Sequence, residues 1–308
     1  QQGYQVKAIE KFIQELAWRD YWQQVWIAKS NAIDSDLKKP QADVDNHEIP
    51  RIIVVGKTGI QAVDQAIVKF YDTGYLHNHV RMYIAALTCN VGKCHWRHPA
   101  QWMYYHLLDA DWASNALSWQ WVAGSNSNKK YFANQENINT YCHTEQRHTF
   151  VDIPYEAFAN LEIPKELTDT YALKLLTPLP KQKQLAIIPE LPTLIYNLYK
   201  LDPNWSVDLT ANRILLLEPS HFTKYPISQN SIDFMLALGR NIKNLQIFVG
   251  EFDELISKYN IADIYFKEHP SNNDYKGNED SRDWMFNVTG YYPSFFAFWK
   301  KCKKELNY

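Results

Sequence analysis

The sequence lacks a charge excess and a long apolar run. Its 32 lysines and arginines nearly balance its 34 aspartates and glutamates, which leaves a net charge of −2. Non-specific coating of nucleic acid needs a basic surface and is therefore not expected, although a local basic patch is not excluded. No apolar run approaches the roughly 18 residues of a membrane span, and no charged-then-apolar leader opens the printed chain. These absences predict a soluble protein without a membrane partner.

Cysteines are few and scattered. No C-x-x-C pair occurs among Cys89, Cys94, Cys142 and Cys302. Reduced thiols are therefore expected, in a cytoplasmic protein or, in a eukaryote, a nuclear or organellar one. The C-x4-C-H pattern that ends at His95 lacks the second ligand pair of a zinc site. No metal is expected.

Aromatic residues are abundant instead. They make up 15% of the 308 residues, and tryptophan is densest before residue 125. Large aromatic side chains fill protein cores, so ordinary packing accounts for much of this excess. Tryptophan at this density also suits stacking on a planar ligand or electron transfer.

Apolar periodicity divides the chain into a helical part and a mixed part. Helices are expected over residues 4–27, from Thr58 towards Gly74, over 77–87, and from Pro99 onward. Residues 28–57 and 110–150 have few periodic apolar positions and are expected to be irregular. We therefore expect a helical domain over residues 1–165.

The remaining residues, 166–308, alternate between short strands and helices. Compact apolar runs at 213–219, 245–249 and 264–266 are separated by helical patterns at 232–245 and 253–259. Strands alternating with helices at this spacing predict a parallel sheet with right-handed crossovers. The expected fold is mainly α, with a small α/β domain after the helical one.

Three sequence blocks stand out in the first half. They are E-L-A-W-R-D-Y-W from residue 15, T-G-Y-L-H-N-H-V-R-M from residue 73, and a third block made of H-W-R at 95–97 and D-A-D-W-A-S-N-A-L-S-W-Q-W from residue 109. Each has an ordinary interpretation alone: an aromatic anchor with an ion pair, a polar helix start, and a helix start capped by aspartate and serine. Their order and spacing together make the ordinary interpretation unlikely to hold for all three.

In this order the blocks resemble the FAD-binding domain of photolyases and cryptochromes. The pattern of that family runs E-x-x-W-R, then T-G-W-x-H-N-x-x-R-M, then D-W-R, then D-x-D-x-x-x-N-x-x-x-W-Q-W. The resemblance covers residues 10–135 and implies a helical domain that binds FAD. Residues 212–219 and 245–254 more loosely resemble part of the family's α/β antenna domain.

The resemblance implies roles for twelve residues. Those that would line the flavin are Arg19, Asn78, Arg81, Asp109, Asp111 and Asn115. Trp119 and Trp96 match the first two tryptophans that carry electrons to the photoexcited flavin. The residues that would contact a cyclobutane pyrimidine dimer flipped out of DNA are Glu15, Trp18, Met82 and Trp121. The resemblance also implies an Arg81–Asp109 ion pair against the flavin ring, with Asn115 beside its N5 atom.

The chain departs from the family pattern at several positions. The printed sequence does not include the Ser/Thr-rich loop that holds the FAD diphosphate, nor the N-terminal antenna domain. Tyr75 stands where the family has tryptophan, and His79 replaces an arginine that faces DNA, which weakens phosphate neutralisation. Residues 28–57 offer no third electron-chain tryptophan. Asn78 and Met82 occupy positions where six-four photoproduct enzymes carry histidines, which favours the cyclobutane dimer.

Three functions remain open. The chain is a light-driven repair enzyme that acts on UV-damaged DNA, or a cryptochrome-like blue-light receptor that acts through a signalling protein. Alternatively, it is a helical scaffold that no longer binds FAD. The near-neutral charge and the replaced arginine favour the receptor, and the dimer-contact set favours repair.

Overall fold

The computed structural model describes residues 5–306, which form two compact units. The helical unit comprises residues 31–175, and the sheet unit comprises residues 5–30 together with 176–306. Packing thus groups the first helix with the α/β segment, whereas the sequence-based division at residue 165 places it in the helical half. No helix within residues 5–306 is long and apolar enough to cross a membrane. The two units are described separately below.

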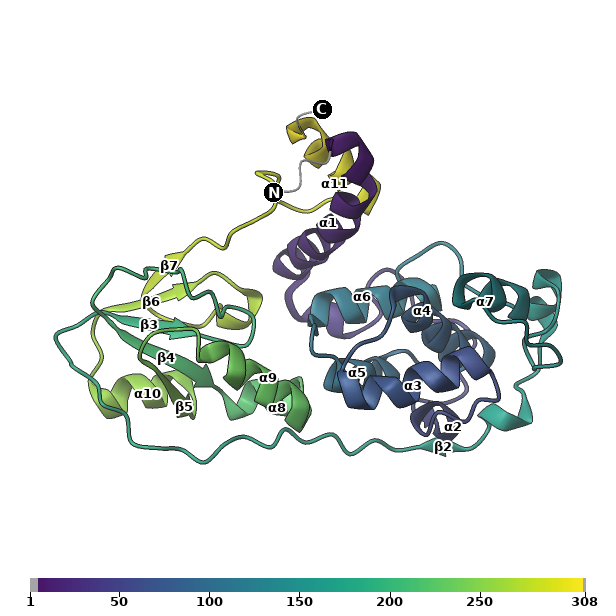
Figure 1. Ribbon diagram of the computed structural model, residues 1–308, viewed down its shortest axis with the longest axis horizontal. Helices are drawn as coiled ribbons and strands as arrows, with labels where there is room; N and C mark the ends of the chain where they lie inside the picture. The colour runs from purple at the N-terminus through teal and green to yellow at the C-terminus, as the bar shows by residue number, and fades with distance from the viewer. Residues whose placement is uncertain (1–4, 307–308) are drawn as a thin grey trace. The chain divides into compact units, whose positions relative to one another are not determined.

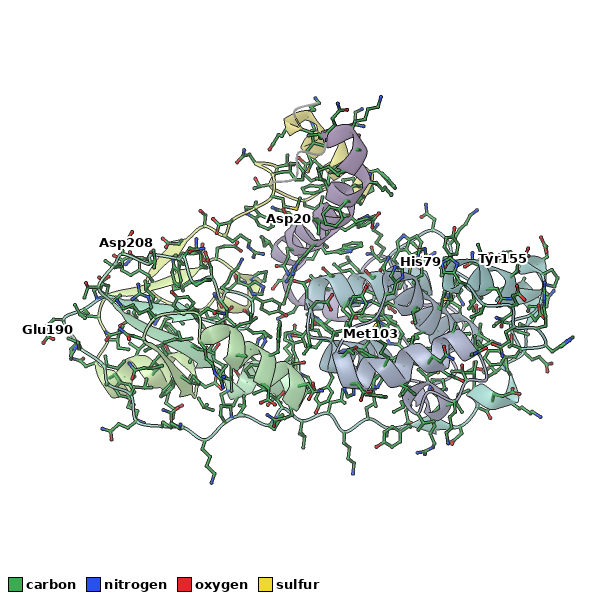
Figure 2. All side chains as sticks on the ribbon, viewed as in Figure 1. Asp20, His79, Met103, Tyr155, Glu190 and Asp208 are labelled. Carbon is green, nitrogen blue, oxygen red and sulfur yellow. The ribbon has the colours of Figure 1, made fainter. Side chains whose placement is uncertain are left out.

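The helical unit is built from short helices and connecting turns (Figure 1). Its α-helices are α2 (Arg51–Val54), α3 (Gln61–Thr73), α4 (Asn78–Ala86), α5 (Arg97–His106), α6 (Trp112–Ala123) and α7 (Gln135–Cys142). Shorter helical turns cover Ser30–Asp34, Leu87–Val91, Tyr155–Asn160 and Lys165–Leu167, and the two-residue strands β1 (Ile49–Pro50) and β2 (Thr170–Tyr171) pair antiparallel. Met103 of α5 lies in the interior of this unit (Figure 2) and is 1% exposed.

Local signals set the ends of α3 and α4 close to where they are expected. Gly74 ends α3 in the left-handed conformation at φ 63°, which glycine adopts without a steric penalty. His77 caps α4, because its Nδ1 accepts the backbone N–H of His79. Thr58 does not cap α3. Instead its hydroxyl and its N–H both donate to Asp64, and Ile60 is the capping residue.

The expectation that residues 110–150 are mostly loops is wrong for about half of them. Helices α6 and α7 lie in this stretch, and Asp111 and Asn134 cap them by accepting backbone N–H groups. Helix α6 buries nine of its twelve residues. A helix that is buried nearly all round shows no amphipathic period, so its sequence carries no periodic signal.

The sheet unit contains a five-stranded parallel sheet in the order β5-β4-β3-β6-β7 (Figure 1). Its strands are β3 (Thr193–Tyr196), β4 (Asn212–Leu217), β5 (Leu245–Val249), β6 (Ile264–Lys267) and β7 (Asn278–Asp280). Its helices are α1 (Val6–Lys29), α8 (Pro219–Lys224), α9 (Gln229–Gly239), α10 (Phe252–Tyr259) and α11 (Phe295–Cys302), with further turns at Pro270–Asn272 and Lys303–Glu305. The parallel sheet confirms the expected α/β segment.

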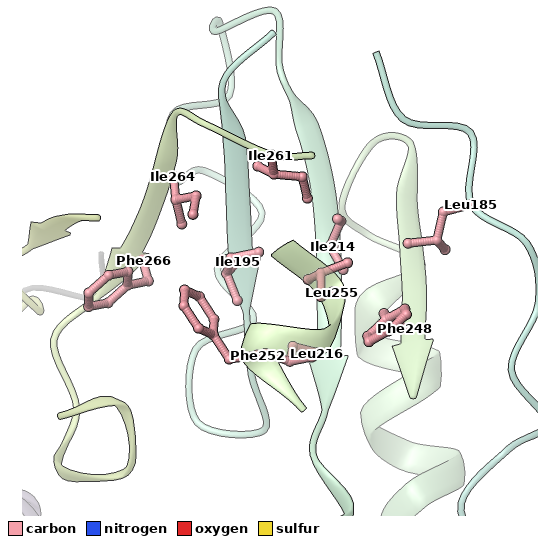
Figure 3. Packing of buried hydrophobic residues seen from close by; sticks show 10 residues of the cluster. All are labelled: Leu185, Ile195, Ile214, Leu216, Phe248, Phe252, Leu255, Ile261, Ile264 and Phe266. Atoms are coloured by element: carbon pink, nitrogen blue, oxygen red, sulfur yellow. The ribbon is translucent and has the colours of Figure 1, made fainter. Parts of the chain in front are cut away.

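Helix α10 covers one face of the sheet. Figure 3 shows Phe252 and Leu255 of α10 among side chains from four strands. Those strand residues are Ile195, Ile214, Leu216, Phe248, Ile264 and Phe266. Leu255 is fully buried, and burial of a leucine side chain contributes about 1.5–3 kcal/mol. This core accounts for the apolar runs in the sequence of the C-terminal half.

Helix α1 is held within the sheet unit by contacts at both of its ends. Near its start, Glu10 forms an ion pair with Lys303. Nearer its end, the Gln23 amide oxygen accepts a 2.6 Å hydrogen bond from Arg282, which also forms a two-pronged ion pair with Glu268. These polar contacts thus tie α1 to segments more than 250 residues away in the sequence.

Candidate functional site

Two helical stripes in the helical unit carry five of the twelve residues that the resemblance singles out. On α4, Asn78 and Met82 are one turn apart, and the Asn78 Nδ2 lies 4.0 Å from the Met82 Sδ. On α6, the positions Asp111, Asn115 and Trp119 recur every fourth residue. Residues at this spacing lie on one face of a helix. The sequence motifs therefore correspond to two continuous surfaces on packed helices.

An ion pair joins these stripes. The Arg81 guanidinium of α4 donates 2.9 and 3.1 Å hydrogen bonds to the two carboxylate oxygens of Asp109, just before α6. Its Nε donates to the Leu76 carbonyl, which fixes the plane of the guanidinium. The Arg81 side chain is 26% exposed and that of Asp109 55% exposed, so both retain polar atoms at the surface. The expected Arg81–Asp109 pair is thus present.

Asp111 and Asn115 are buried at the start of α6. The Asp111 carboxylate accepts the backbone N–H of Ser114, which satisfies one of the unpaired donors at a helix start. The Asn115 amide donates a 2.8 Å hydrogen bond to the Ala100 carbonyl of α5. This contact holds the amide in one orientation and links α5 to α6.

The two expected electron-carrying tryptophans are both buried, but their indole N–H groups differ. Trp96, at the start of α5, is fully buried and donates its N–H to Asp36 at 2.7 Å. Trp119 of α6 is 2% exposed, and its indole N–H has no hydrogen-bond partner within the part of the chain that the structure describes. The neighbouring Trp112 donates to Asp34 at 2.7 Å. Sequence reasoning missed both aspartates.

The expected substrate contacts of the helical unit lie at its surface. Trp121 of α6 is 39% exposed, and its ring lies 6.1 Å from that of Tyr131. Tyr75, where the family has tryptophan, is 58% exposed. His79 (Figure 2) stacks between two rings, that of His77 at 5.3 Å and that of Tyr141 at 4.5 Å. Replacement of the family's arginine has thus put an aromatic stack in place of a fixed positive charge.

The three expected site residues of α1 belong to the sheet unit. Glu15 is exposed and forms an ion pair with Lys11 one turn earlier. The Trp18 ring stacks on Phe295 of α11, with 3.7 Å between ring centroids and an 11° angle between planes. The Arg19 charge contributes to the lowered pKa of the buried His269, for which burial is the largest cause. These residues have well-defined surroundings within their own unit.

Polar groups beside α6 fit a polar, planar ligand. The Ser114 hydroxyl and the Trp119 indole N–H are buried without a hydrogen-bond partner among residues 5–306. A buried unpaired donor costs about 1–3 kcal/mol, so such groups call for a partner. The Asn115 amide, the Arg81 guanidinium and the two carboxylates nearby in the sequence are groups of the kind that pair with the carbonyl oxygens and ring nitrogens of a flavin.

Comparisons with known proteins agree with these observations. A family model described as the FAD binding domain of DNA photolyase matches residues 12–161. The deoxyribodipyrimidine photo-lyase of Streptomyces griseus is 33% identical over 125 residues, 39% of this chain and 27% of that protein. The protein of the same name from Halobacterium salinarum is 29% identical over 128 residues, 40% of this chain and 27% of its own. That of Agrobacterium fabrum is 40% identical over 77 residues, 25% of this chain and 16% of its own.

The family-model match includes most of α1, which belongs to the sheet unit, and most of the helical unit. The chain thus aligns with about a quarter of the length of the first two relatives. The cofactor of the matched domain is FAD. Residues 12–161 of this chain are therefore similar to the FAD binding domain of DNA photolyase.

Proposed function

We propose that this chain binds FAD on the α4 and α6 stripes and uses it for light-driven repair of cyclobutane pyrimidine dimers in DNA. The observation that supports this most strongly is the Arg81–Asp109 ion pair, which lies between the two stripes with the buried Asn115 amide on one of them. When bound, FAD supplies light-driven donation of an electron to the dimer and takes it back after the ring has opened. The protein supplies binding, orientation and electrostatics.

Each stripe residue has a distinct part in this proposal. Arg81 donates to flavin carbonyl oxygens, and Asp109 keeps the guanidinium in place. Asp111 and Asn78 border the ring, and Asn115 presents its amide to the ring edge, where a fixed dipole tunes the electron affinity of the cofactor.

The electron carriers and the substrate contacts complete the proposal. Trp119 and Trp96 pass electrons inward from solution to restore the reduced cofactor. A pyrimidine dimer must leave the duplex to reach the flavin, and aromatic side chains such as Trp121 and Trp18 stabilise an extruded base by stacking. Met82 and Glu15 provide an apolar and a carboxylate contact to the dimer.

The first test is the visible absorption spectrum of the full chain after reconstitution with FAD, in the dark and after blue light with a thiol. We expect a bound flavin spectrum that bleaches under light. Arg81→Ala removes a charge-assisted contact worth about 1.5–3 kcal/mol, so FAD affinity should fall by about tenfold or more. Arg51→Ala is the matched control, because Arg51 forms an exposed ion pair with Asp169 in the same unit.

The second test is repair of a short oligonucleotide that contains one thymine dimer, followed by chromatography. Light-dependent loss of the dimer is expected. Trp121→Ala should weaken binding of the damaged oligonucleotide by about 1–3 kcal/mol, the contribution of one stacked base. Tyr155→Ala, which removes another exposed aromatic ring of the helical unit, should leave binding unchanged. Failure to bind flavin even in excess FAD would overturn the proposal and leave an interaction scaffold.

A second candidate function is a cryptochrome-like blue-light receptor. The stack of Trp18 on Phe295 favours it, because one face of a proposed dimer contact is covered by α11. A receptor would bind FAD and bleach in light but leave the dimer intact. The two tests together therefore separate repair, reception and scaffold.

A further inference from the structure

Trp96 is the tryptophan whose indole N–H is paired with a carboxylate at the edge of the unit. Its ring is fully buried, while its Nε1 donates to Asp36 Oδ1 over 2.7 Å. The Asp36 side chain is 21% exposed and so can exchange protons with water. The pair therefore connects a buried ring to solvent through a single carboxylate.

The surroundings of Asp36 fit an ionised carboxylate. Its Oδ2 accepts the backbone N–H of Gln41 at 2.9 Å, and the His95 Nε2 lies 3.5 Å from Oδ1. The His95 Nδ1 accepts the N–H of Arg97, which assigns the proton of the neutral ring to Nε2, facing Asp36. With Trp96, three donors thus point at two oxygens. The Asp36 Oδ1 that accepts the hydrogen bond of the indole N–H is thus in position to receive its proton.

Two other buried indole groups of the region, those of Trp119 and Trp112, lack this arrangement. The Trp119 Nε1 has no hydrogen-bond partner among the described residues, so none of their side chains is placed to take the proton of an oxidised Trp119. The Trp112 Nε1 donates to Asp34 at the same 2.7 Å, but Asp34 is only 7% exposed. Trp96 alone of the three combines a carboxylate partner with an opening to solvent.

We propose that Asp36 accepts the indole proton of Trp96 when that ring loses an electron, so that the charge is trapped on Trp96 as a neutral radical. This inference rests on the proposed electron path from Trp96 through Trp119. The oxidant is the photoexcited oxidised flavin, which takes one electron from Trp119, and Trp96 refills Trp119. The Nε1–H bond of Trp96 breaks as an O–H bond forms on Asp36, and an added thiol later returns the electron while the proton moves back.

This proposal gives a physical role to a departure from the family pattern. Residues 28–57 provide no third tryptophan to carry the oxidised state onward to the surface. Proton loss from an oxidised indole makes return of the electron unfavourable, because the proton would have to return as well. A further electron carrier slows return of the electron by moving the oxidised site farther from the flavin. Asp36 would slow it instead by removing the proton from oxidised Trp96.

The test is time-resolved absorption of the FAD-loaded chain, in which cationic and neutral tryptophan radicals have different spectra. In the wild type, the cation signal should convert to the neutral signal, more slowly in D2O than in H2O. Asp36→Asn keeps the size of the side chain but cannot take the proton. A positioned base typically contributes 10²–10⁴-fold, so conversion should slow by about a hundredfold or more. Asp34→Asn is the matched control and should leave the rate unchanged.

A flavin-free measurement separates this inference from the proposed function. Laser photoionisation of tryptophan in the chain without cofactor generates the radicals directly. The fast-converting component should be absent from Trp96→Phe and from Asp36→Asn, and Asp36→Glu, which retains a carboxylate, should restore it. Near-UV circular dichroism checks that each variant is folded. If Asp36→Asn does not fold, Asp36→Glu and the D2O comparison in the wild type decide the question.

Three results would overturn the inference. One is conversion in Asp36→Asn at the wild-type rate, and the other is equal slowing in Asp34→Asn. Absence of a D2O effect in the wild type would do the same. Failure of the chain to bind FAD would overturn the proposed function but leave the photoionisation result interpretable.

Discussion

Loss of the Arg282 guanidinium should destabilise the sheet unit strongly. This side chain is 4% exposed, and it donates to both oxygens of Glu268, with one bond of 2.8 Å, and to Gln23 of α1 at 2.6 Å. Arg282→Met fills most of the same volume but leaves the Glu268 carboxylate, which is 25% exposed, without its main partner. Removal of one member of a buried ion pair costs about 3–5 kcal/mol.

Urea unfolding of the full chain, followed by far-UV circular dichroism, measures this cost. With a denaturant dependence of about 2 kcal/mol/M, a loss of 4 kcal/mol lowers the midpoint by about 2 M. Leu255→Ala identifies which transition belongs to the sheet unit, because a cavity in its core lowers stability by about 2–5 kcal/mol. Arg282→Met should move that same transition.

The control for Arg282→Met is Lys303→Met. Lys303 also joins a distant segment to α1, through a 2.7 Å ion pair with Glu10, but its side chain is 48% exposed. Surface pairs contribute about 0–1 kcal/mol. A midpoint shift in Arg282→Met no larger than in Lys303→Met would refute the reasoning. The double variant with Glu268→Gln should recover part of the loss, since the unpaired charge is then gone.

Three further predictions concern a glycine, a histidine and a lysine. Gly74→Ala should destabilise the helical unit by at least about 2 kcal/mol, measured by thermal unfolding, because an alanine at φ 63° is strained and its Cβ would overlap Leu108. Burial lowers the pKa of His106 to about 4, so below pH 6.5 the unfolded chain binds more protons than the folded one. The free energy of unfolding should therefore fall as the pH decreases from 6.5 towards 4. In His106→Phe, the urea midpoint should depend less on pH over that range. Burial likewise lowers the pKa of Lys200 to about 8, so between pH 8 and 10.5 the unfolded chain binds more protons than the folded one. The free energy of unfolding of the wild type, measured relative to that of Lys200→Met, should therefore rise as the pH increases through this range.

Sequence reasoning succeeds where local signals coincide with burial on one side of an element. Helix α3 has an apolar stripe of Val63, Ile67 and Phe70 and ends at Gly74, so both its face and its end are encoded locally. The apolar runs that became β4 and β5 are equally local. Elements of this kind can be predicted from sequence without knowing what packs against them.

The elements that were missed lack such a signal. Helix α6 is buried on nearly every side, so its periodicity is lost. Strand β3 (Thr193–Tyr196) is only four residues long and directly follows Pro192 in a proline-rich stretch. It nevertheless occupies the centre of the sheet, because it pairs with both β4 and β6. Its place is decided by partners later in the chain.

The motif resemblance gives the identity of the site residues but not their partners. The Arg81–Asp109 pair is inferable because both members belong to the motif. The carboxylates that accept the indole protons of Trp112 and Trp96 do not, since Asp34 and Asp36 lie 78 and 60 residues earlier, in a stretch without apolar period. Spacing cannot connect residues so far apart, and two aspartates in an irregular segment are ordinary surface residues by any local criterion. Yet these contacts decide which buried ring can lose a proton when it is oxidised. The proposed chemistry of Trp96 thus depends on a segment that carries no recognisable signal. Substitution of Asp36 should change the photochemistry while every family motif remains intact.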